Sequence, residues 1–270
     1  MVRALLLSLL LCTALFSDLL DEKIRSFVTP NQYGVHGKLI SKIFSDREQF
    51  YDGSNVNSLK VLEKLKQDGL LRLDMKVPGE VSIKFKLDFS SFFAIKAIGD
   101  SLGAIGYNYF TVSSARNGED GFYLDLSIDT EYNPDPVLLG GELKKRGIKI
   151  GDISKDGNSW GYYLITFDPA MPEAEHINIG ERKSVSKLFD NYWLDIRSGG
   201  NLLSLDSQSG NSWHPYVVFY DKHLNILSIF ESDAKSTSKM LDVPSGTRFI
   251  KVGDLYGFYN IKNGFSVGLN

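Results

Sequence analysis

Cysteine is nearly missing from this sequence: among 270 residues there is one, Cys12, and it lies in an apolar run near the N-terminus. A chain without paired cysteines cannot be a small domain held together by disulfides. Proline is also scarce, with 8 residues, which argues against long disordered linkers. The net charge of −3 provides no overall attraction to nucleic acid, which a basic face normally supplies. We therefore expect no nucleic-acid partner.

The N-terminus has the composition of an export signal. Arg3 supplies a positive charge, residues 4–16 are mostly apolar, and polarity returns at Asp18. A run this short cannot span a bilayer, which needs about 20 apolar residues, but it matches the apolar region of a secretory signal. We predict a cleavable signal peptide over residues 1–17; cleavage after Ala14 and a buried N-terminal helix are the alternatives. A lipoprotein signal is disfavoured because Leu11, which precedes Cys12, is not small.

The mature chain is therefore expected outside the cytoplasm, and the absence of cysteine favours a bacterial periplasm. Nothing after the signal is long and apolar enough to cross a membrane, so we expect no membrane span in the mature chain. Residues 18–55 stay unassigned, because the short apolar run "GKLISKIF" fits a strand and a helix equally well.

From residue 56 to residue 167 one order recurs three times: helix, glycine, strand, turn, strand. The glycines are Gly69, Gly106 and Gly147, placed where a chain leaving a helix often needs a left-handed residue. Asp135 and Pro136 have the N-cap and first-position chemistry that begins the third helix. The first strand pair is predicted to turn at Pro78-Gly79, and the second helix to bury a stripe of apolar residues: Phe92, Ile95, Ile98, Leu102 and Ile105.

The strands of this part alternate between apolar and polar side chains. Residues 81–89 place Val, Ile, Phe, Leu and Phe on one side and Ser, Lys, Lys and Asp on the other, and residues 122–129 repeat the pattern. Such alternation indicates a sheet with one dry and one wet face. We predict an α+β domain over residues 56–167, an antiparallel sheet covered by helices, built from repeated αββ units in a ferredoxin-like order. Duplication and convergence explain the repetition equally well.

After a linker at residues 168–177, which has two prolines and no periodicity, the pattern changes. Residues 178–270 hold a series of short strand candidates separated by glycine- and asparagine-containing turns. Several short strands at regular spacing are typical of a β-sandwich or barrel. We predict a C-terminal β-sandwich.

Three stretches of this part carry a resemblance: "LDIRSGGNLLSLDS", "WHPYVVFYDKHLNIL" and the closing "SGTRFIKVGD" with "YGFYNIKNGFSVGL". From about residue 185 to residue 270 they resemble the galactose-binding-like jelly-roll modules at the end of many exported proteins. With the α+β part before it, the chain is similar to uncharacterised periplasmic proteins of Gram-negative bacteria. The resemblance implies a module that binds sugars, binds proteins or only packs, and its usual ligand residues cannot be transferred because no ligand motif is recognisable.

Catalytic chemistry finds little support. "GNSWG" at residues 157–161 matches a hydrolase elbow, but a strand rather than a helix follows it, so we interpret it as a hairpin turn. No two of the four histidines have metal-ligand spacing; they are His36, His176, His214 and His223. Carboxylates in the C-terminal part could pair in a glycosidase or bind a structural calcium ion: Asp195, Asp206, Asp221, Glu231, Asp233 and Asp254. Asp221 has the simpler role of starting a turn.

Aromatic residues are the more useful signal in residues 178–270. Flat rings stack on sugars and anchor protein interfaces. We expect Trp193 in the core and Trp213, beside a glycine-containing turn, to have the better chance of exposure. Trp213, His214 and Tyr216 form our candidate ligand-binding site, with no catalytic or metal residues assigned.

These observations favour an exported, non-enzymatic binding or assembly protein of the cell envelope. It would dock a glycan or a protein partner through the β-sandwich and the sheet edges. The alternatives are an envelope carbohydrate-active enzyme with paired carboxylates and a purely structural subunit of an envelope complex.

Export makes a simple prediction. In a Gram-negative host, the chain recovered from the periplasm should begin at Asp18, which N-terminal sequencing or intact-mass measurement reads directly. A periplasmic chain that starts at Leu15 would support the alternative cleavage site, and an uncleaved cytoplasmic chain that starts at Met1 would refute the signal peptide.

Overall fold

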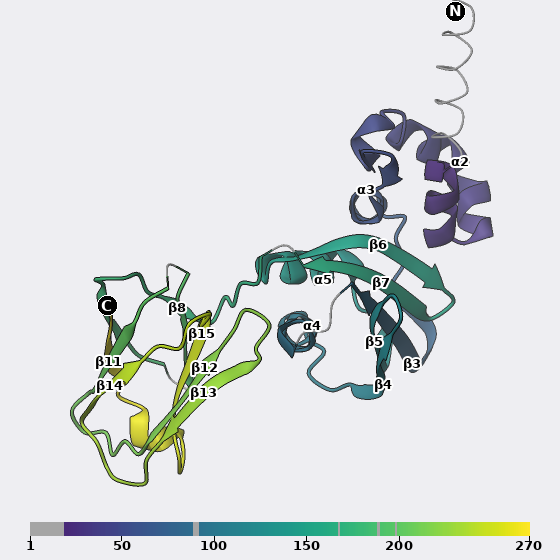
Figure 1. The fold of residues 1–270 in the computed structure, drawn as a ribbon. Coiled ribbons are helices and arrows are strands. Elements are labelled where there is room, and N and C mark those ends of the chain that lie inside the picture. The colour runs from purple at the N-terminus through teal and green to yellow at the C-terminus, as the bar shows by residue number, and fades with distance from the viewer. Residues whose placement is uncertain (1–18, 89–91, 167, 188–189, 198) are drawn as a thin grey trace, which may run out of the picture. The chain divides into compact units, whose positions relative to one another are not determined.

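The computed structural model describes residues 19–88, 92–166, 168–187, 190–197 and 199–270 (Figure 1). The predicted signal peptide, residues 1–17 with Cys12, lies outside the described residues. Contacts between residues divide the chain into two compact units: unit 1 comprises residues 1–90 and 98–167, and unit 2 comprises residues 91–97 and 168–270. The fold class is α+β, with several open sheets.

The unassigned N-terminal segment is largely helical. A helix runs over residues 19–27, and α2 follows at Pro30–Ile43. Thr29 and Gln32 form a capping box at the start of α2, each side chain bonding the backbone N–H of the other, and Pro30 occupies the first helical position. "GKLISKIF" is therefore helical rather than extended. A short 3-10 helix, Glu48–Phe50, and the two-residue strands β1 (Tyr51–Asp52) and β2 (Asn55–Val56) lead into α3 (Ser58–Gln67).

Five strands form the sheet of unit 1, in the order β4-β5-β3-β7-β6. They are β3 (Asp74–Leu87), β4 (Thr111–Gly118), β5 (Gly121–Tyr132), β6 (Ile148–Asp156) and β7 (Ser159–Thr166). The central strand β3 pairs antiparallel with β5 and parallel with β7. Helix α4 (Phe92–Ala104) connects β3 to β4, and α5 (Pro136–Lys145) connects β5 to β6.

The predicted alternation along these strands is confirmed. On β3, Val81, Ile83, Phe85 and Leu87 are buried, while the residues between them are partly or fully exposed. The same holds on β5 for Phe122, Leu124, Leu126 and Ile128. Helices α3 and α5 pack against each other and against β6. The sheet therefore has one buried face and one face open to solvent.

Helix ends follow the sequence signals. Asp135 is the N-cap of α5 and accepts hydrogen bonds from the N–H groups of Val137 and Leu138, with Pro136 at the first position. Gly69, Gly106 and Gly147 all adopt positive φ, at +70°, +100° and +72°. Glycine takes this left-handed conformation without the steric penalty of a Cβ atom, so these residues end the helices as predicted.

Three expectations for unit 1 are wrong. Pro78-Gly79 is not a hairpin turn: β3 runs through it, with a register irregularity between Asp74 and Gly79 that accommodates the missing N–H of proline. The stripe predicted for α4 is wrong at Phe92 and Ile95, which are exposed, whereas Ile98 and Leu102 are buried as predicted, together with Phe93. The ferredoxin-like order would place the strand after α5 beside β3, but β7 lies there, parallel to β3.

Unit 2 contains a five-stranded and a four-stranded sheet, visible as separate layers of strands in Figure 1. The first has the order β13-β12-β15-β10-β8 and the second β14-β11-β16-β9. The strands are β8 (Glu175–His176), β9 (Arg182–Val185), β10 (Tyr192–Asp195), β11 (Leu202–Ser207), β12 (Pro215–Tyr220), β13 (Ile226–Glu231), β14 (Ser238–Asp242), β15 (Phe249–Asp254) and β16 (Phe265–Leu269). One buried cluster draws side chains from both sheets, among them Leu194, Val217 and Val252 from the first and Leu203 and Val267 from the second.

The segment predicted as a linker, residues 168–177, is part of unit 2. Its strand β8 pairs parallel with β10, and Ile177 is buried in the common cluster. Arg248 donates from its guanidinium to the Pro169 carbonyl over 2.9 Å and to the Asp195 carboxylate over 2.6 Å. The two prolines remove the side-chain periodicity that would reveal a strand in the sequence. Backbone pairing of β8 with β10 and the bond from Arg248 nevertheless hold the segment against the rest of unit 2. None of the helices in the described part of the chain has the length and apolar character that a membrane span requires.

Two glycines with equally open surroundings test how strongly backbone conformation matters. A Cβ atom added to Gly69 or to Gly34, inside α2, meets nothing within 4 Å. Gly69→Ala should cost about 1–2 kcal/mol of unfolding free energy because its φ is +70°. Gly34→Ala should instead add about 0.5–1 kcal/mol, because alanine favours a helix interior. Urea unfolding followed by circular dichroism measures both, and equal signs for the two variants would contradict this account.

Candidate functional site

The three residues predicted to bind a ligand do not lie together on the surface. The side chain of Trp213 points to the same side of the chain as those of Val217 and Phe219. All three belong to the buried cluster of unit 2. The indole is 0% exposed, packs edge-on against Phe265, and donates from Nε1 to the Gly253 carbonyl over 2.8 Å. Trp213, predicted to have the better chance of exposure of the two tryptophans, is therefore buried, and its ring is not available to stack on a ligand at the surface. Trp193, expected in the core, is buried.

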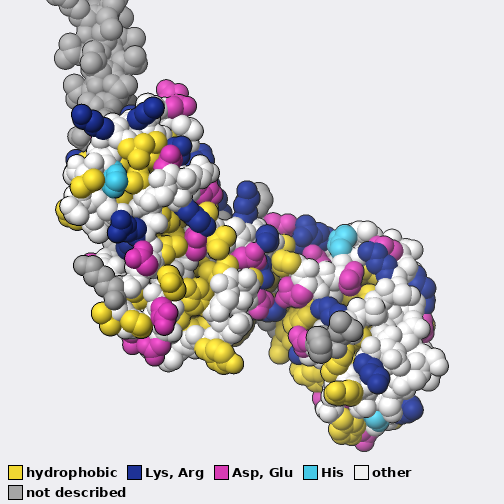
Figure 2. All heavy atoms as spheres, turned by 180° about the vertical axis from the view of Figure 1, so that it is seen from behind, with side chains coloured by type: hydrophobic (Ala, Val, Ile, Leu, Met, Phe, Trp, Pro, Cys, Tyr) yellow, Lys and Arg dark blue, Asp and Glu magenta, His cyan; other side chains and the backbone are white. Residues whose placement is uncertain are grey.

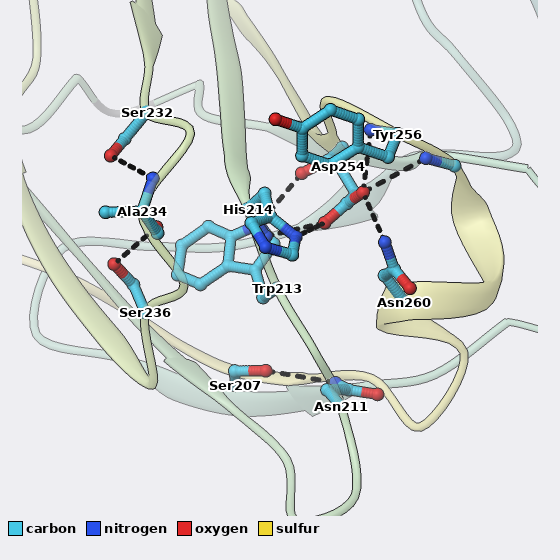
Figure 3. A network of polar contacts seen from close by, with 12 residues as sticks. Ser207, Asn211, Trp213, His214, Ser232, Ala234, Ser236, Asp254, Tyr256 and Asn260 are labelled. Atoms are coloured by element: carbon cyan, nitrogen blue, oxygen red, sulfur yellow. Dashed lines mark hydrogen bonds and ion pairs between the residues drawn. The ribbon is translucent and has the colours of Figure 1, made fainter.

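His214 and Tyr216 point away from that cluster, and both are partly exposed. The imidazole of His214 lies edge-on to the ring of Tyr256, with 4.9 Å between ring centroids (Figure 3). Its Nδ1 atom is 3.6 Å from a carboxylate oxygen of Asp254 and has no hydrogen bond within the described chain. Two rings that follow Asp254 along the chain are exposed: Tyr256 at 68%, and Tyr259, in the 3-10 helix Phe258–Ile261, at 86%.

Asp254 organises the loop beneath this surface (Figure 3). Its fully buried carboxylate accepts hydrogen bonds from the backbone N–H groups of His214, Tyr256 and Gly257 and from the side-chain amide of Asn260, over 2.6–3.0 Å. Burial by itself would raise the pKa of Asp254, but the hydrogen bonds outweigh it and lower the pKa below its ordinary value. A carboxylate with four donors holds a loop in place and has little capacity left for acid–base chemistry.

Three of the other candidate carboxylates, Asp195, Asp206 and Asp221, also have structural partners. Asp195 is buried and bonds Arg248 and Arg197, and Asp206 forms an ion pair with Arg182. Asp221 accepts from the N–H groups of His223 and Asn225, which is the turn role assigned to it. In the described ranges, no group of three or more histidine, cysteine, aspartate or glutamate residues is placed to hold a metal ion. The structural calcium stays a prediction.

The "GNSWG" motif is a hairpin. Gly157, with φ +57°, and Asn158 form the turn between β6 and β7, and Ser159 is the first residue of β7. A nucleophile elbow needs a helix after the serine, so the arrangement confirms the structural interpretation.

Strand β13 lies at an unpaired edge of its sheet and has exposed apolar residues, a combination that the sequence alone does not reveal. It is the edge of the five-stranded sheet: β12 pairs with it on one side, and no strand of the described chain pairs with it on the other. Five of its six residues are exposed, including Ile226 at 58%, Leu227 at 40% and Ile229 at 47%. "NILSIFES" was recognisable as a strand, but its edge position depends on partners distant in sequence. β13 is therefore a candidate docking site.

On the face drawn in Figure 2, lysine and arginine side chains are interspersed with aspartate and glutamate. No family model, curated protein or solved structure matches this chain. The interpretation of its function therefore depends on the geometry of the chain itself.

The role of Asp254 makes a pH-dependent prediction. The pKa of Asp254 is lower in the folded state than in the unfolded state. The carboxylate therefore stabilises the fold at pH values above the ordinary pKa of 3.8, and this stabilisation is lost as the pH falls through the folded-state pKa. Asp254→Asn should cost about 1–3 kcal/mol at neutral pH, since buried N–H groups lose a charged acceptor. That difference from the unsubstituted chain should shrink as the pH falls below 3.8.

Urea unfolding at neutral and acidic pH measures this effect. Asp206→Asn is the matched control, because its exposed ion pair with Arg182 should contribute less than about 1 kcal/mol. A difference for Asp254→Asn that does not change with pH would contradict the structural role of the carboxylate.

Proposed function

We propose that this chain is an exported, non-enzymatic binding or assembly protein of the cell envelope that docks an extended segment of a partner protein along β13. The observation that carries the proposal is the open, apolar edge of the five-stranded sheet. An unpaired edge presents a row of backbone N–H and C=O groups, which an added strand satisfies. Ile226, Leu227 and Ile229 supply apolar contacts beside that row.

β13 carries few of the devices by which soluble proteins usually protect such an edge. These devices are charged residues, especially lysine, or proline in the strand, very short strands, β-bulges, and covering loops or helices. β13 is six residues long, contains neither lysine nor proline, and has its single charge, Glu231, at the last position. Its pairing with β12 has one irregularity, which leaves Leu227 without a partner residue on β12. An edge of this kind favours strand addition, and a specific partner strand would protect it from non-specific aggregation.

The rest of unit 2 fits a docking module. We propose that its two sheets form a jelly-roll-like β-sandwich of the galactose-binding-like type, supported by the single buried cluster to which both sheets contribute. In the same proposal, residues 1–17 direct export to the periplasm, where the partner would be an envelope protein. Four of the carboxylates that a glycosidase could use are engaged elsewhere, so no particular observation favours the enzymatic alternative: Asp195, Asp206, Asp221 and Asp254.

The edge can be tested with one substitution and a matched control. Ile229→Lys places a positive charge on β13, whereas Met240→Lys places the same charge at an exposed apolar position of β14, the edge of the other sheet. A partner identified by crosslinking in the native envelope should bind the Ile229→Lys variant at least about ten-fold more weakly and the Met240→Lys variant normally. Calorimetry with the purified partner measures the affinities.

Hydrogen exchange gives an independent readout. Binding of that partner should slow amide exchange in residues 226–231 and leave residues 238–242 unchanged. Loss of affinity in both variants, or full affinity in the Ile229→Lys variant, would refute docking on β13. A partner that binds normally to both variants would instead support a structural subunit that packs through another surface.

A further inference from the structure

The open face of the unit 1 sheet carries a row of aligned side chains. Strand register places Arg116 of β4 opposite Tyr123 of β5, Tyr123 opposite Lys86 of β3, Lys86 beside Tyr163 of β7, and Tyr163 opposite Asp152 of β6. Lys86, Tyr123 and Tyr163 lie on the solvent side, because their neighbours along β3, β5 and β7 are buried, and strand register places Arg116 and Asp152 at the two ends of the same row. We call these five residues the cation–aromatic row.

Contacts hold the row in one arrangement. The Lys86 ammonium lies 5.9 Å from the ring centroid of Tyr123 and 5.8 Å from that of Tyr163, and the Arg116 guanidinium lies 4.1 Å from the Tyr123 centroid. Cations at these distances are attracted to aromatic faces. Asp120 accepts from both Lys86 and the Tyr123 hydroxyl over 2.6 Å. The Tyr163 hydroxyl donates to Asp88, so both rings are oriented by a carboxylate.

The charges of the row are also fixed. The hydrogen bond to Asp120 raises the pKa of Lys86, and hydrogen bonds to Asp120 and Asp88 raise the pKa values of Tyr123 and Tyr163. At neutral pH the row therefore presents a charged lysine between two neutral phenols. At its far end Asp152 accepts from Lys23 and Ser58, which leaves it little freedom to bind anything else.

The next row along the strands is different. It consists of Ser114, Asp125, Lys84, Gly161 and Ser154, in that order across the sheet. Lys84 and Asp125 are cross-strand neighbours, yet neither side chain has a hydrogen bond or an ion pair within the described chain. With the cation–aromatic row they line a hollow of about 460 Å³, a volume typical of small-ligand sites.

Gly161 keeps this hollow open. Its φ is not in the left-handed region, so the backbone does not require glycine there. The only side chain that a Cβ atom at this position would meet is Ser154, whose hydroxyl can rotate away. Glycine inside a strand weakens the strand and often marks the close approach of a ligand or another backbone.

The chemistry of the hollow limits what can bind. Lys84 offers hydrogen-bond donors, Asp125 offers acceptors, and the ring of Tyr163 offers an apolar surface. Of the charged residues that line it, three are positive and two are negative, with Asp120 and Asp88 adjoining. This balance gives no excess positive charge for a polyanion such as nucleic acid. Mixed donors and acceptors beside aromatic rings instead suit a ligand with many hydroxyl groups.

We propose that the open face of the unit 1 sheet is a glycan-binding site, in which Lys84 and Asp125 bond sugar hydroxyls over the Gly161 hollow and Tyr163 packs against the sugar ring. The site lies entirely in unit 1. It is independent of docking on β13, so each proposal can fail alone.

An oligosaccharide array tests the site. The chain recovered after export is applied to neutral, N-acetylated and acidic hexasaccharides, with a poly-dT oligonucleotide as the polyanion control. The bound hexasaccharide is then titrated by calorimetry. We expect saturable binding that Lys84→Ala, an exposed substitution, weakens about ten-fold. Gly161→Val, which fills the hollow, should weaken hexasaccharide binding at least as much. Lys38→Ala, at an exposed position of α2 outside the hollow, should leave the binding unchanged.

Circular dichroism and the unfolding midpoint establish that each variant is folded, and Lys84→Ala alone decides the result if Gly161→Val does not fold. Three outcomes would overturn the proposal: no hexasaccharide binds the folded chain, the Lys84→Ala and Gly161→Val variants bind as well as the unsubstituted chain, or the oligonucleotide binds more tightly than every sugar.

Discussion

The two-residue repeat of side-chain direction along a strand is the constraint on which the rest of this structure depends. In unit 1 it gives the sheet a buried face of Val, Ile, Leu and Phe and leaves Lys84, Lys86 and Tyr163 in solvent. In unit 2 it sends Trp213 into the core and its neighbour His214 outward. A shift of one residue in either register would exchange core and surface, so burial and the candidate sites are specified together.

Local chemistry predicted local structure well. The N-cap at Asp135, the left-handed glycines after the helices and the alternation along β3 and β5 each depend on residues a few positions apart. The sequence also holds the information that places Trp213: two-residue spacing groups it with Val217 and Phe219, although the glycine-containing turn beside it favours exposure.

What could not be predicted is non-local. Whether β6 or β7 lies beside β3, and whether β13 ends its sheet, depends on strands far apart in sequence, and no single strand records its neighbours. Pro78 was misjudged for a related reason: proline favours a turn locally, but pairing with β5 on both sides of it carries β3 straight through. The cation–aromatic row was missed because its five members come from five strands and become a pattern only through register.

The position of β16 has a consequence for the order of events as the chain folds. It lies between β9 and β11 in the four-stranded sheet, although it follows both of them, and every other strand, along the chain. Until residues 265–269 are available, β9 and β11 have no common neighbour and Phe265 is missing from the side of Trp213. Unit 2 must therefore be completed late, by pairings that span large loops and close slowly.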